Sequence, residues 1–354
     1  MNYKQLGWTE EFEKDFAPYS AEGLTPGRVA LEHKGMYRVW SEDGEMLAEV
    51  SGKFRFQAGE RGDYPAVGDW VALSARTDEG KATIHAVLPR KSKFSRKIAG
   101  ETTEEQIVAA NVDTVFLVTA LNADFNVRRM ERYMIMAWES GANPVIILSK
   151  ADLCDNPGEK AREMEAVALG VPVHVISAES GLGLDELSHY IGEGRTIALL
   201  GSSGVGKSTL VNAFSGGDAA RTGDIRESDD RGKHTTTHRE MIMLAEGGLL
   251  IDTPGMRELQ LWGADTGLGQ SFADIEELAA CCRFRDCSHN GEPGCAVCAA
   301  LEDGSLESER YKSYTKLQRE LAYLERKEVK SLALAEKNKW KKISMFHKQK
   351  KTRK

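Results

Sequence analysis

A glycine-rich stretch near the middle of the chain constrains its fold more than any other part of the sequence. An apolar run, Thr196–Leu200, is expected to form a strand, and a helix-like stretch ending at Phe214 follows the glycines. The loop between them reads Gly201-Ser202-Ser203-Gly204-Val205-Gly206-Lys207-Ser208-Thr209. This is the G-x-x-x-x-G-K-[ST] pattern in the strand–loop–helix setting where it binds phosphates. The alternative is a glycine-rich turn without a ligand, but the complete pattern favours a P-loop.

The residue types of this loop suit a nucleoside triphosphate. Backbone N–H groups can converge on phosphates only where side chains are absent, and the start of the helix adds its dipole. Lys207 is expected to bridge the β- and γ-phosphates, and Ser208 is expected to bind Mg²⁺. Both residues are therefore predicted to be catalytic.

The bulk composition places the chain among soluble proteins of two or three domains. It has 354 residues and a net charge of −7, and it lacks an apolar span of about 18 residues, so no membrane helix is expected. The N-terminus lacks the apolar core of a signal peptide, which predicts a cytoplasmic protein with reduced thiols. Five of the six cysteines lie within Cys281–Cys298, and this clustering indicates a metal site. The sixth, Cys154, is expected to be a small core residue.

The N-terminal third is expected to hold an arm and a small β-barrel. Residues 1–25 are read as a docking helix or a loosely held arm, and the sequence does not separate the two. Short strand-like runs separated by turns follow, at Val29–Glu32, Met36–Ser41, Met46–Val50, Lys53–Gln57, Val67–Leu73 and Ala82–Leu88. This spacing predicts an OB-fold, a barrel that often binds nucleic acid. The basic run Pro89–Lys97 is either an RNA contact or a solvated linker.

From about Val108 the pattern changes to alternating strands and helices. Continuous apolar runs at Thr114–Thr119, Val145–Leu148 and Val173–Ile176 are typical of buried parallel strands. Right-handed crossovers would place these runs in one sheet with the P-loop strand. The ligand site is then expected at the carboxyl ends of the strands.

Two of these strands end in residues that suit guanine. Val145–Leu148 is followed by Ser149-Lys150-Ala151-Asp152, and a carboxylate at Asp152 can accept the N1–H and N2–H donors that adenine does not offer. The Lys150 stem would pack on the base. The next strand ends in Ser177-Ala178, where small side chains let a backbone N–H reach guanine O6. The sequence therefore predicts GTP and GDP as ligands, with Mg²⁺.

A further strand, Leu249–Ile251, ends in Asp252-Thr253-Pro254-Gly255. Asp252 would hold the Mg²⁺ shell, and the Gly255 amide could contact the γ-phosphate. The polar stretch Arg231–His238 fits a switch loop in which a threonine hydroxyl reaches Mg²⁺. Thr236 is placed in the site, although the sequence does not distinguish it from Thr235 and Thr237.

The order of these motifs is permuted, since the guanine motifs precede the P-loop. A permuted GTPase between a small barrel and a Cys/His cluster resembles the RsgA family of ribosome small-subunit-dependent GTPases. The resemblance extends from about Pro26 to about Lys330 and rests on Gly201–Thr209, Arg231–Glu240, Asp252–Gly255 and Cys282–Val297. It implies a cytoplasmic protein that hydrolyses GTP slowly, is stimulated by the 30S subunit and acts late in its maturation, with contacts to 16S rRNA. A monomer is expected.

The resemblance also selects the metal ligands, Cys282, Cys287, His289 and Cys295, which would hold one structural Zn²⁺. Cys281 and Cys298 remain spare, and Cys295 with Cys298 is a rival pair. The implied architecture is multidomain α/β: an arm (1–25), an OB-fold RNA-binding domain (26–98), a circularly permuted GTPase domain (105–265), a helical zinc-binding domain (266–330) and a basic tail (331–354). From Lys337 to Lys354 the tail has nine Lys or Arg and no acid, which suits a phosphate backbone or simply solvent.

Two positions depart from common GTPase patterns. Ser149 stands where Asn or Thr is more usual, but its hydroxyl can still tie the guanine loop to the P-loop. Met256 stands where many GTPases place a glutamine that orients water, and a thioether cannot polarise water. His234 is the predicted substitute, with a partner residue or rRNA phosphate as the alternative. Competing functions are an RNA-binding assembly scaffold whose GTPase domain only senses nucleotide, and a GTP-dependent metallochaperone with labile metal.

Overall fold

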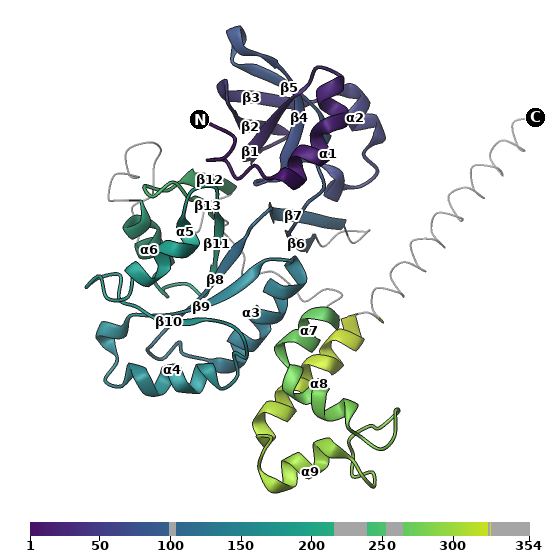
Figure 1. The fold of residues 1–354 in the computed structure, drawn as a ribbon, viewed down its shortest axis with the longest axis vertical. Coiled ribbons are helices and arrows are strands. Elements are labelled where there is room, and N and C mark those ends of the chain that lie inside the picture. The colour runs from purple at the N-terminus through teal and green to yellow at the C-terminus, as the bar shows by residue number, and fades with distance from the viewer. Residues whose placement is uncertain (99–103, 216–238, 253–264, 325, 327–354) are drawn as a thin grey trace, which may run out of the picture. The chain divides into compact units, whose positions relative to one another are not determined.

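Five strands in the N-terminal part of the chain close into a barrel (Figure 1). The computed structural model describes residues 1–98, 104–215, 239–252, 265–324 and 326. The barrel strands are β1 (Thr25–His33), β2 (Met36–Ser41), β3 (Gly44–Val50), β4 (Trp70–Arg76) and β5 (Lys81–Val87). Their order is β1-β2-β3-β5-β4, and an additional β1–β4 pairing closes the ring. The predicted OB-like barrel is confirmed, with buried Val29, Val39, Leu73 and Ile84 in its core.

One predicted strand in this region is wrong. Lys53–Gln57 lies within helix α2 (Gly52–Gln57), between β3 and β4. Phe54 and Phe56 alternate with polar residues, which imitates the period of a strand. The Ser51 hydroxyl, however, caps a helix by accepting a 3.0 Å hydrogen bond from the Phe54 N–H. Phe54 packs against the barrel core, whereas Phe56 is 91% exposed.

The predicted strand Val67–Leu73 begins later, at Trp70. Gly68 adopts a φ of +95°, and a Cβ there would lie 2.0 Å from the Ala110 carbonyl oxygen. Only glycine suits a position with both a left-handed backbone and such a close approach. The chain therefore turns at Gly68 before β4 starts.

The N-terminal arm forms a docking helix, which settles the alternative that the sequence left open. Helix α1 (Glu10–Ala21) buries Phe12 and Phe16. The Trp8 ring packs edge-on against Trp70 of β4, with ring centroids 4.6 Å apart. The arm thus closes one side of the barrel with aromatic side chains.

The α/β region confirms the predicted parallel sheet. Its strands are β8 (Thr114–Ala120), β9 (Asn143–Ser149), β10 (Val173–Val175), β11 (Thr196–Gly201) and β13 (Leu249–Asp252), with β12 (Arg239–Met243) antiparallel. The order is β10-β9-β8-β11-β13-β12. The helices are α3 (Val127–Ser140), α4 (Pro157–Glu165), α5 (Ser188–Ile191) and α6 (Lys207–Phe214), and 3₁₀ turns span Arg61–Asp63, Thr77–Glu79, Ala151–Leu153 and Asp185–Leu187. Cys154, expected in the core, is only half-buried because it follows the Ala151–Leu153 turn at the sheet edge.

The barrel and the α/β sheet form one continuous sheet of 11 strands. Strand β1 pairs antiparallel with β12, with Leu31 opposite Glu240. The Arg38 guanidinium also forms a 2.9 Å ion pair with Glu240. Both domains belong to one compact unit, Met1–Arg96 with Glu105–Gln260.

A buried arginine joins the arm, the barrel and the α/β domain. The Arg28 guanidinium donates to the carbonyl oxygens of Leu6, Gly68 (3.3 Å) and Asn111 (3.1 Å), and to the Thr196 hydroxyl (2.8 Å). Burial lowers the pKa of Arg28 to about 10, so the side chain is cationic at neutral pH. Removal of this side chain would take a donor from the Leu6 and Asn111 carbonyls and from the Thr196 hydroxyl, whereas the Gly68 carbonyl would keep the Asn111 amide at 3.0 Å.

Part of the basic run Pro89–Lys97 is held by the fold, whereas Lys91 and Lys93 are exposed. It leads into β6 (Lys93–Ile98), which pairs with β7 (Glu104–Ala110) in a separate two-stranded sheet. Arg90 forms a 2.7 Å ion pair with the buried Asp69, and Phe94 is buried. The side chains that suggested RNA binding are therefore partly structural.

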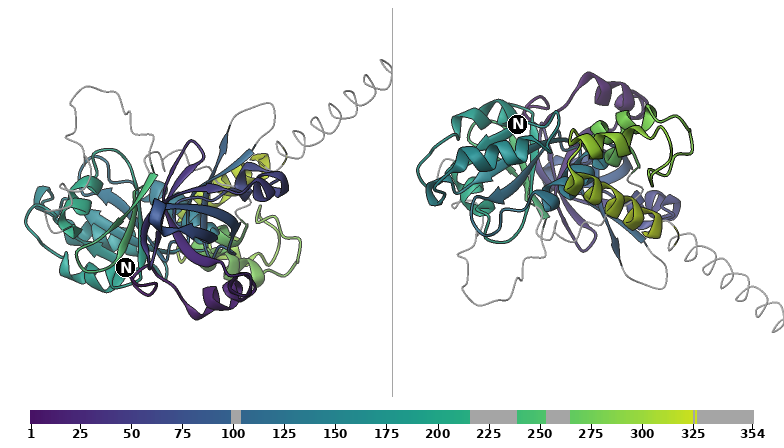
Figure 2. Two further views of the ribbon diagram at one scale, coloured as in Figure 1. Left: turned by 90° about the horizontal axis from the view of Figure 1, so that it is seen from above. Right: turned by 90° about the horizontal axis from the view of Figure 1, so that it is seen from below.

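The second compact unit comprises Lys97–Glu104 and Leu261–Lys354. It contains α7 (Asp265–Ser271), α8 (Ala273–Ala280), α9 (Ala296–Asp303) and a helix over 308–324 (Figure 2). The helical character predicted for this region is confirmed. Arg310 forms a bidentate pair with Asp274, and the Tyr314 hydroxyl donates to Glu276 at 2.7 Å. Among the residues described, none of the helices is long and apolar enough to cross a membrane.

Candidate functional site

The predicted P-loop connects a fully buried strand to a helix. All six residues of β11 are buried, and Gly206 forms the N-cap of α6 with a φ of +96°. At Gly201, a Cβ would lie 2.3 Å from the Val118 carbonyl oxygen of the neighbouring strand. Close strand packing and the sharp turn into α6 therefore both require glycine. Ser203, Gly204, Ser208 and Thr209 are exposed along the loop and the helix start.

Lys207 lies over the loop that precedes it. Its ammonium donates to the carbonyl oxygens of Gly201 at 2.8 Å and Ser202 at 2.5 Å. These contacts keep the lysine at the carboxyl end of β11, on the side where the P-loop presents its backbone. A cation at that position can neutralise the negative charge of phosphate oxygens.

The predicted guanine motif lies beside the predicted P-loop. Ser149 ends β9, and its hydroxyl donates to the Val205 carbonyl oxygen at 2.6 Å. Lys150 then adopts a left-handed φ of 61°, and the Ala151 N–H donates to Ile176 on the neighbouring chain segment at 3.0 Å. Asp152 is exposed at the turn that follows. The carboxylate is thus held at the sheet edge but remains open to a ligand.

The second predicted guanine segment follows β10, the neighbour of β9. Ser177 is fully buried, its N–H donates to Leu182, and its hydroxyl accepts a 3.2 Å hydrogen bond from the Ser180 N–H. Ala178 is half-buried and packs against the core of the α/β domain. Because β9, β10 and β11 are parallel, their carboxyl ends bring both guanine segments and the P-loop to one edge of the sheet.

Asp252 ends β13, which pairs in parallel with the P-loop strand. The side chain is exposed at the same edge as Ser208 in the first turn of α6. The remaining predicted site residues lie outside the described part of the chain. They are His234, Thr235, Thr236, Thr237, Gly255 and Met256.

One residue that contacts the P-loop was not predicted from the sequence. Arg129, in the first turn of α3, donates from Nη1 to the Ser202 hydroxyl and to Asp124. The loop that follows β8 carries no known motif, so its proximity to the P-loop depends on the strand order β9-β8-β11. Only the position of Arg129 after the carboxyl end of a buried strand could have indicated it.

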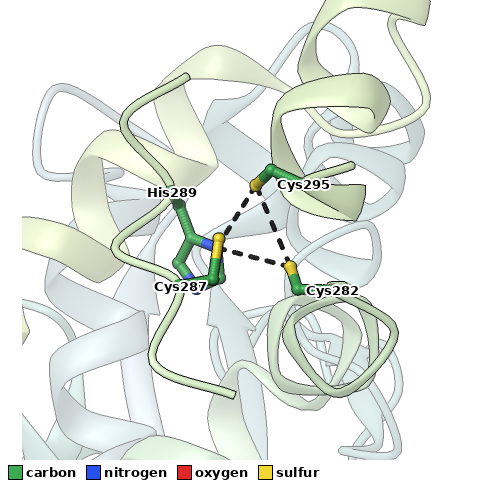
Figure 3. Close-up of side chains that lie close together, drawn as sticks. All are labelled: Cys282, Cys287, His289 and Cys295. Carbon is green, nitrogen blue, oxygen red and sulfur yellow. Dashed lines mark hydrogen bonds between the residues drawn. The ribbon is translucent and has the colours of Figure 1, made fainter. Parts of the chain in front are cut away.

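The second candidate site is a compact group of three cysteines and a histidine (Figure 3). The potential ligand atoms of Cys282, Cys287, His289 and Cys295 all lie within 4.8 Å of one another. The Cys282 and Cys295 sulfurs are 3.9 Å apart, and they lie 3.6 and 3.4 Å from His289 Nδ1. Ligands around a tetrahedral ion with metal–sulfur bonds of about 2.3 Å would be separated by roughly 3.5–3.8 Å. The donor set and its spacing therefore fit zinc.

The local backbone explains how these four residues meet. Cys282 follows α8, Cys295 is the N-cap of α9, and His289 adopts a left-handed φ of 57°. Between them, Glu292 accepts hydrogen bonds from the Ser288 hydroxyl and the N–H groups of Ser288 and Asn290. These bonds, led by that of the Ser288 hydroxyl, lower the pKa of Glu292 to about 2. The ionised Glu292 carboxylate thus stabilises the loop over residues 288–292 through these hydrogen bonds.

The two spare cysteines lie differently. Cys298 donates from Sγ to the His289 carbonyl oxygen at 3.4 Å, and its N–H donates to the Cys295 sulfur at 3.3 Å. Cys298 therefore contacts two of the four potential ligand residues without being one of the four, whereas Cys281 is exposed. The geometry favours the four-residue set over the rival pair of Cys295 and Cys298.

Comparison with known proteins gives two family models that match this chain. The model described as RsgA GTPase matches residues 87–262, and the model described as 50S ribosome-binding GTPase matches residues 196–336.

Full-length relatives agree with the first of these models. The chain is 47% identical to the small ribosomal subunit biogenesis GTPase RsgA of Opitutus terrae, covering 97% of this chain and 96% of the relative. It is 48% identical to RsgA 2 of Lactiplantibacillus plantarum, covering 91% and 90%.

Two solved structures have the same fold. YjeQ from Thermotoga maritima superposes with a TM-score of 0.64 at 29% identity, covering 84% of this chain and 99% of YjeQ. YloQ, described as a circularly permuted GTPase, superposes with a TM-score of 0.61 at 25% identity, covering 84% and 95%.

Proposed function

Because the chain belongs to the RsgA family of GTPases, we propose that it binds and hydrolyses GTP during biogenesis of the small ribosomal subunit. The observation that carries this proposal is the shared sheet edge. There the Ser149 hydroxyl links the guanine loop to the Val205 carbonyl of the P-loop. A loop with the phosphate-binding pattern and a loop that suits guanine are thus joined directly at one edge of the sheet.

The proposed mechanism is in-line attack of water on the γ-phosphate. The backbone of Gly201–Thr209 would cradle the phosphates, and Lys207 would neutralise charge that develops on the β- and γ-oxygens. Bound Mg²⁺, held by Ser208 with Asp252 in its outer shell, would supply further charge neutralisation. Thr236 and Gly255 are proposed γ-phosphate contacts. Lys150, Asp152, Ser177 and Ala178 would select guanine.

Turnover by the protein alone is proposed to be slow. Met256 cannot orient water, so another group must do so. His234 is the proposed group in this chain. His234→Ala should lower ribosome-stimulated turnover at unchanged GTP affinity, and unchanged stimulated turnover would assign the role to a partner or to an rRNA phosphate.

Zinc is proposed to be structural. Four protein ligands complete a tetrahedral ion and leave no position for a substrate. The Cys₃His group joins α8 to α9, so a bound ion would stabilise the helical domain by linking its elements. A metallochaperone would instead require metal that exchanges readily.

The proposed partner is the 30S subunit, with contacts to 16S rRNA. Helix α2 carries the 91% exposed ring of Phe56 next to the exposed cations Lys53 and Arg55. A free aromatic face beside positive charge is the combination that stacks on unpaired bases. The OB-fold (26–98), the GTPase domain (105–265), the zinc domain (266–330) and the basic tail (331–354) are proposed as separate functional parts of a monomer. A role on ribosomes would place the protein in the cytoplasm.

Cosedimentation with purified 30S and 50S subunits, in GDP and in a non-hydrolysable GTP analogue, tests the partner. Preferential binding to 30S in the analogue is expected. Binding to 50S alone would instead support the partner named by the second family model, and no preference for either subunit would refute the ribosomal proposal. Lys207→Ala is the control, because it should lose nucleotide binding or turnover.

A scaffold that only senses nucleotide is the second candidate, favoured by the methionine at position 256. Multiple-turnover GTP hydrolysis, measured with and without 30S subunits, separates the two functions. A GTPase should turn over repeatedly and accelerate with 30S. A sensor should bind GTP without stimulated turnover.

A further inference from the structure

An arginine outside the known GTPase motifs reaches the P-loop. Arg129 lies in the first turn of α3 (Val127–Ser140), and its Nη1 donates to the Ser202 hydroxyl at 2.5 Å. Ser202 is the second residue of the P-loop and is half-buried. The contact joins residues 73 positions apart in the sequence, across β8 and β11.

Asp124 orients the arginine. It accepts a 2.7 Å hydrogen bond from the same Nη1 atom, and its own N–H donates to Asn122 at 2.9 Å. Its second carboxylate oxygen is buried and has no hydrogen-bond partner within the described residues. The 2.7 Å ion pair with Asp124 limits the directions that the Arg129 guanidinium can take. Asp124 therefore holds the Arg129 guanidinium by a contact that is separate from the contact with the P-loop.

The backbone at Arg129 is also fixed. Asn126 caps α3 by accepting a 2.9 Å hydrogen bond from the Arg129 N–H. The Arg129 side chain is 31% exposed. Because its backbone is capped by Asn126 and its guanidinium is paired with Asp124, few rotamers are open to it. The cap and the ion pair together set the direction from which the guanidinium approaches Ser202.

Ser202 is held from two sides. Its side chain accepts from Arg129, and its carbonyl oxygen accepts a 2.5 Å hydrogen bond from Lys207. The Arg129 contact to the Ser202 hydroxyl does not involve Lys207, so a move of Lys207 to phosphate oxygens would leave it intact as an anchor of the loop. An anchor of this kind lowers the entropy that the loop loses on binding.

We propose that Arg129 is a positioning residue of the nucleotide site, which acts through Ser202 to hold the P-loop in its phosphate-binding shape. The inference rests on the proposed function, since it assumes that the P-loop binds GTP and GDP. Because the arginine acts on the loop rather than on the γ-phosphate, it should strengthen binding of both nucleotides equally. It should change the rate of the chemical step much less.

The test combines a double-mutant cycle with a matched control. Arg129→Ala, Ser202→Ala and the double variant are compared in full-length protein, using fluorescent GDP and a fluorescent non-hydrolysable GTP analogue. The expected loss is about tenfold in affinity for both nucleotides in each single variant, the change that follows from removing one charged hydrogen bond. The double variant should be no weaker than the weaker single variant, because both changes remove one interaction.

Arg128→Ala is the control. Arg128 lies in the same turn of α3 and pairs with Glu131 at 2.8 Å rather than with Ser202. Its removal perturbs the helix and should leave nucleotide affinity within about twofold of the wild type. An equal loss in the Arg128 variant would show that general weakening of α3 explains the result, and would overturn the inference.

Three further outcomes would also overturn it: unchanged affinity in Arg129→Ala, losses that add in the double variant, or a loss confined to turnover at saturating GTP. The last would mean that Arg129 acts on the reacting phosphate. Failure of the wild-type protein to bind either nucleotide would instead refute the proposed function, so the two failures are distinguishable.

Discussion

The Ser149 hydroxyl donates a 2.6 Å hydrogen bond to the Val205 carbonyl oxygen and thereby joins the guanine loop to the P-loop. The Thr119 carbonyl oxygen lies 3.2 Å from the same hydroxyl. One hydroxyl hydrogen can serve only one of them well, and the shorter distance favours Val205. The sequence predicted that serine would make this link in place of the usual asparagine or threonine, and the structure contains it.

Ser149→Ala should weaken binding of GDP and GTP by about fivefold to tenfold, because the buried Val205 carbonyl would lose its donor. Ser149→Thr keeps the hydroxyl and should bind nearly as well as the wild type. Titration with fluorescent GDP measures both. Equal affinity of the alanine variant would show that the link does not support the site.

Asp152→Asn should change the preferred base. An amide can donate to the O2 atom of xanthine, whereas the carboxylate accepts the N1–H and N2–H of guanine. We expect GTP affinity to fall about a hundredfold, as two charged hydrogen bonds are lost, and XTP affinity to rise. Competition between GTP, XTP and ATP measures the change, and retained selectivity for GTP would remove Asp152 from the site.

Cys287→Ser should release zinc and lower the thermal stability of the helical domain, since three ligands hold the ion poorly. Cys298→Ser should retain one zinc per chain, because its sulfur donates to the His289 carbonyl instead of joining the four ligands. Elemental analysis of purified protein distinguishes them. Zinc loss in the Cys298 variant would instead support Cys295 and Cys298 as a pair of zinc ligands.

Arg28→Ala should destabilise the first compact unit by about 3 kcal/mol, because the buried acceptors on Leu6, Asn111 and Thr196 lose this donor. Arg38→Ala is the matched control on the neighbouring barrel strand. Arg38 is 35% exposed and pairs with surface acids, so its loss should cost less than about 1 kcal/mol. Urea unfolding compares the two, and similar costs would contradict the role assigned to Arg28.

Phe56→Ala should weaken binding to 30S subunits by roughly tenfold without changing GTP affinity, because base stacking on one aromatic ring contributes about 1–3 kcal/mol. Leu47→Ala is the control, since Leu47 is also exposed on the barrel, at 54%, but offers no ring. Cosedimentation in a GTP analogue measures the effect. A larger loss in the leucine variant would place the contact elsewhere on the barrel.

Much of the fold follows from local patterns, and the exceptions have physical causes. Buried parallel strands appear as continuous apolar runs, so the strand before Ser149 and the strand before Gly201 were predicted within two residues. Helix α2 was misread because Phe54 and Phe56 alternate as they would in a strand, while the deciding hydrogen bond comes from the Ser51 cap.

The parts of the site that the sequence did not reveal depend on distant partners. Arg129 meets Ser202 across 73 positions, and Arg28 meets Thr196 across 168. Arg28 also binds backbone carbonyls, which every residue type supplies and which leave no trace in the sequence. Such contacts become visible only once the order of strands is known.

The ladder between β1 and β12 has a consequence for how the molecule can bend. Glu240 lies opposite Asp252 on one side and Leu31 on the other, and Leu31 lies opposite Arg38. A single row of paired strand residues therefore runs from Asp252, which is proposed to lie near Mg²⁺, to Arg38 in the barrel. Rotation of one domain against the other would break these pairings, so the two domains are joined by strand pairing as well as by the covalent chain.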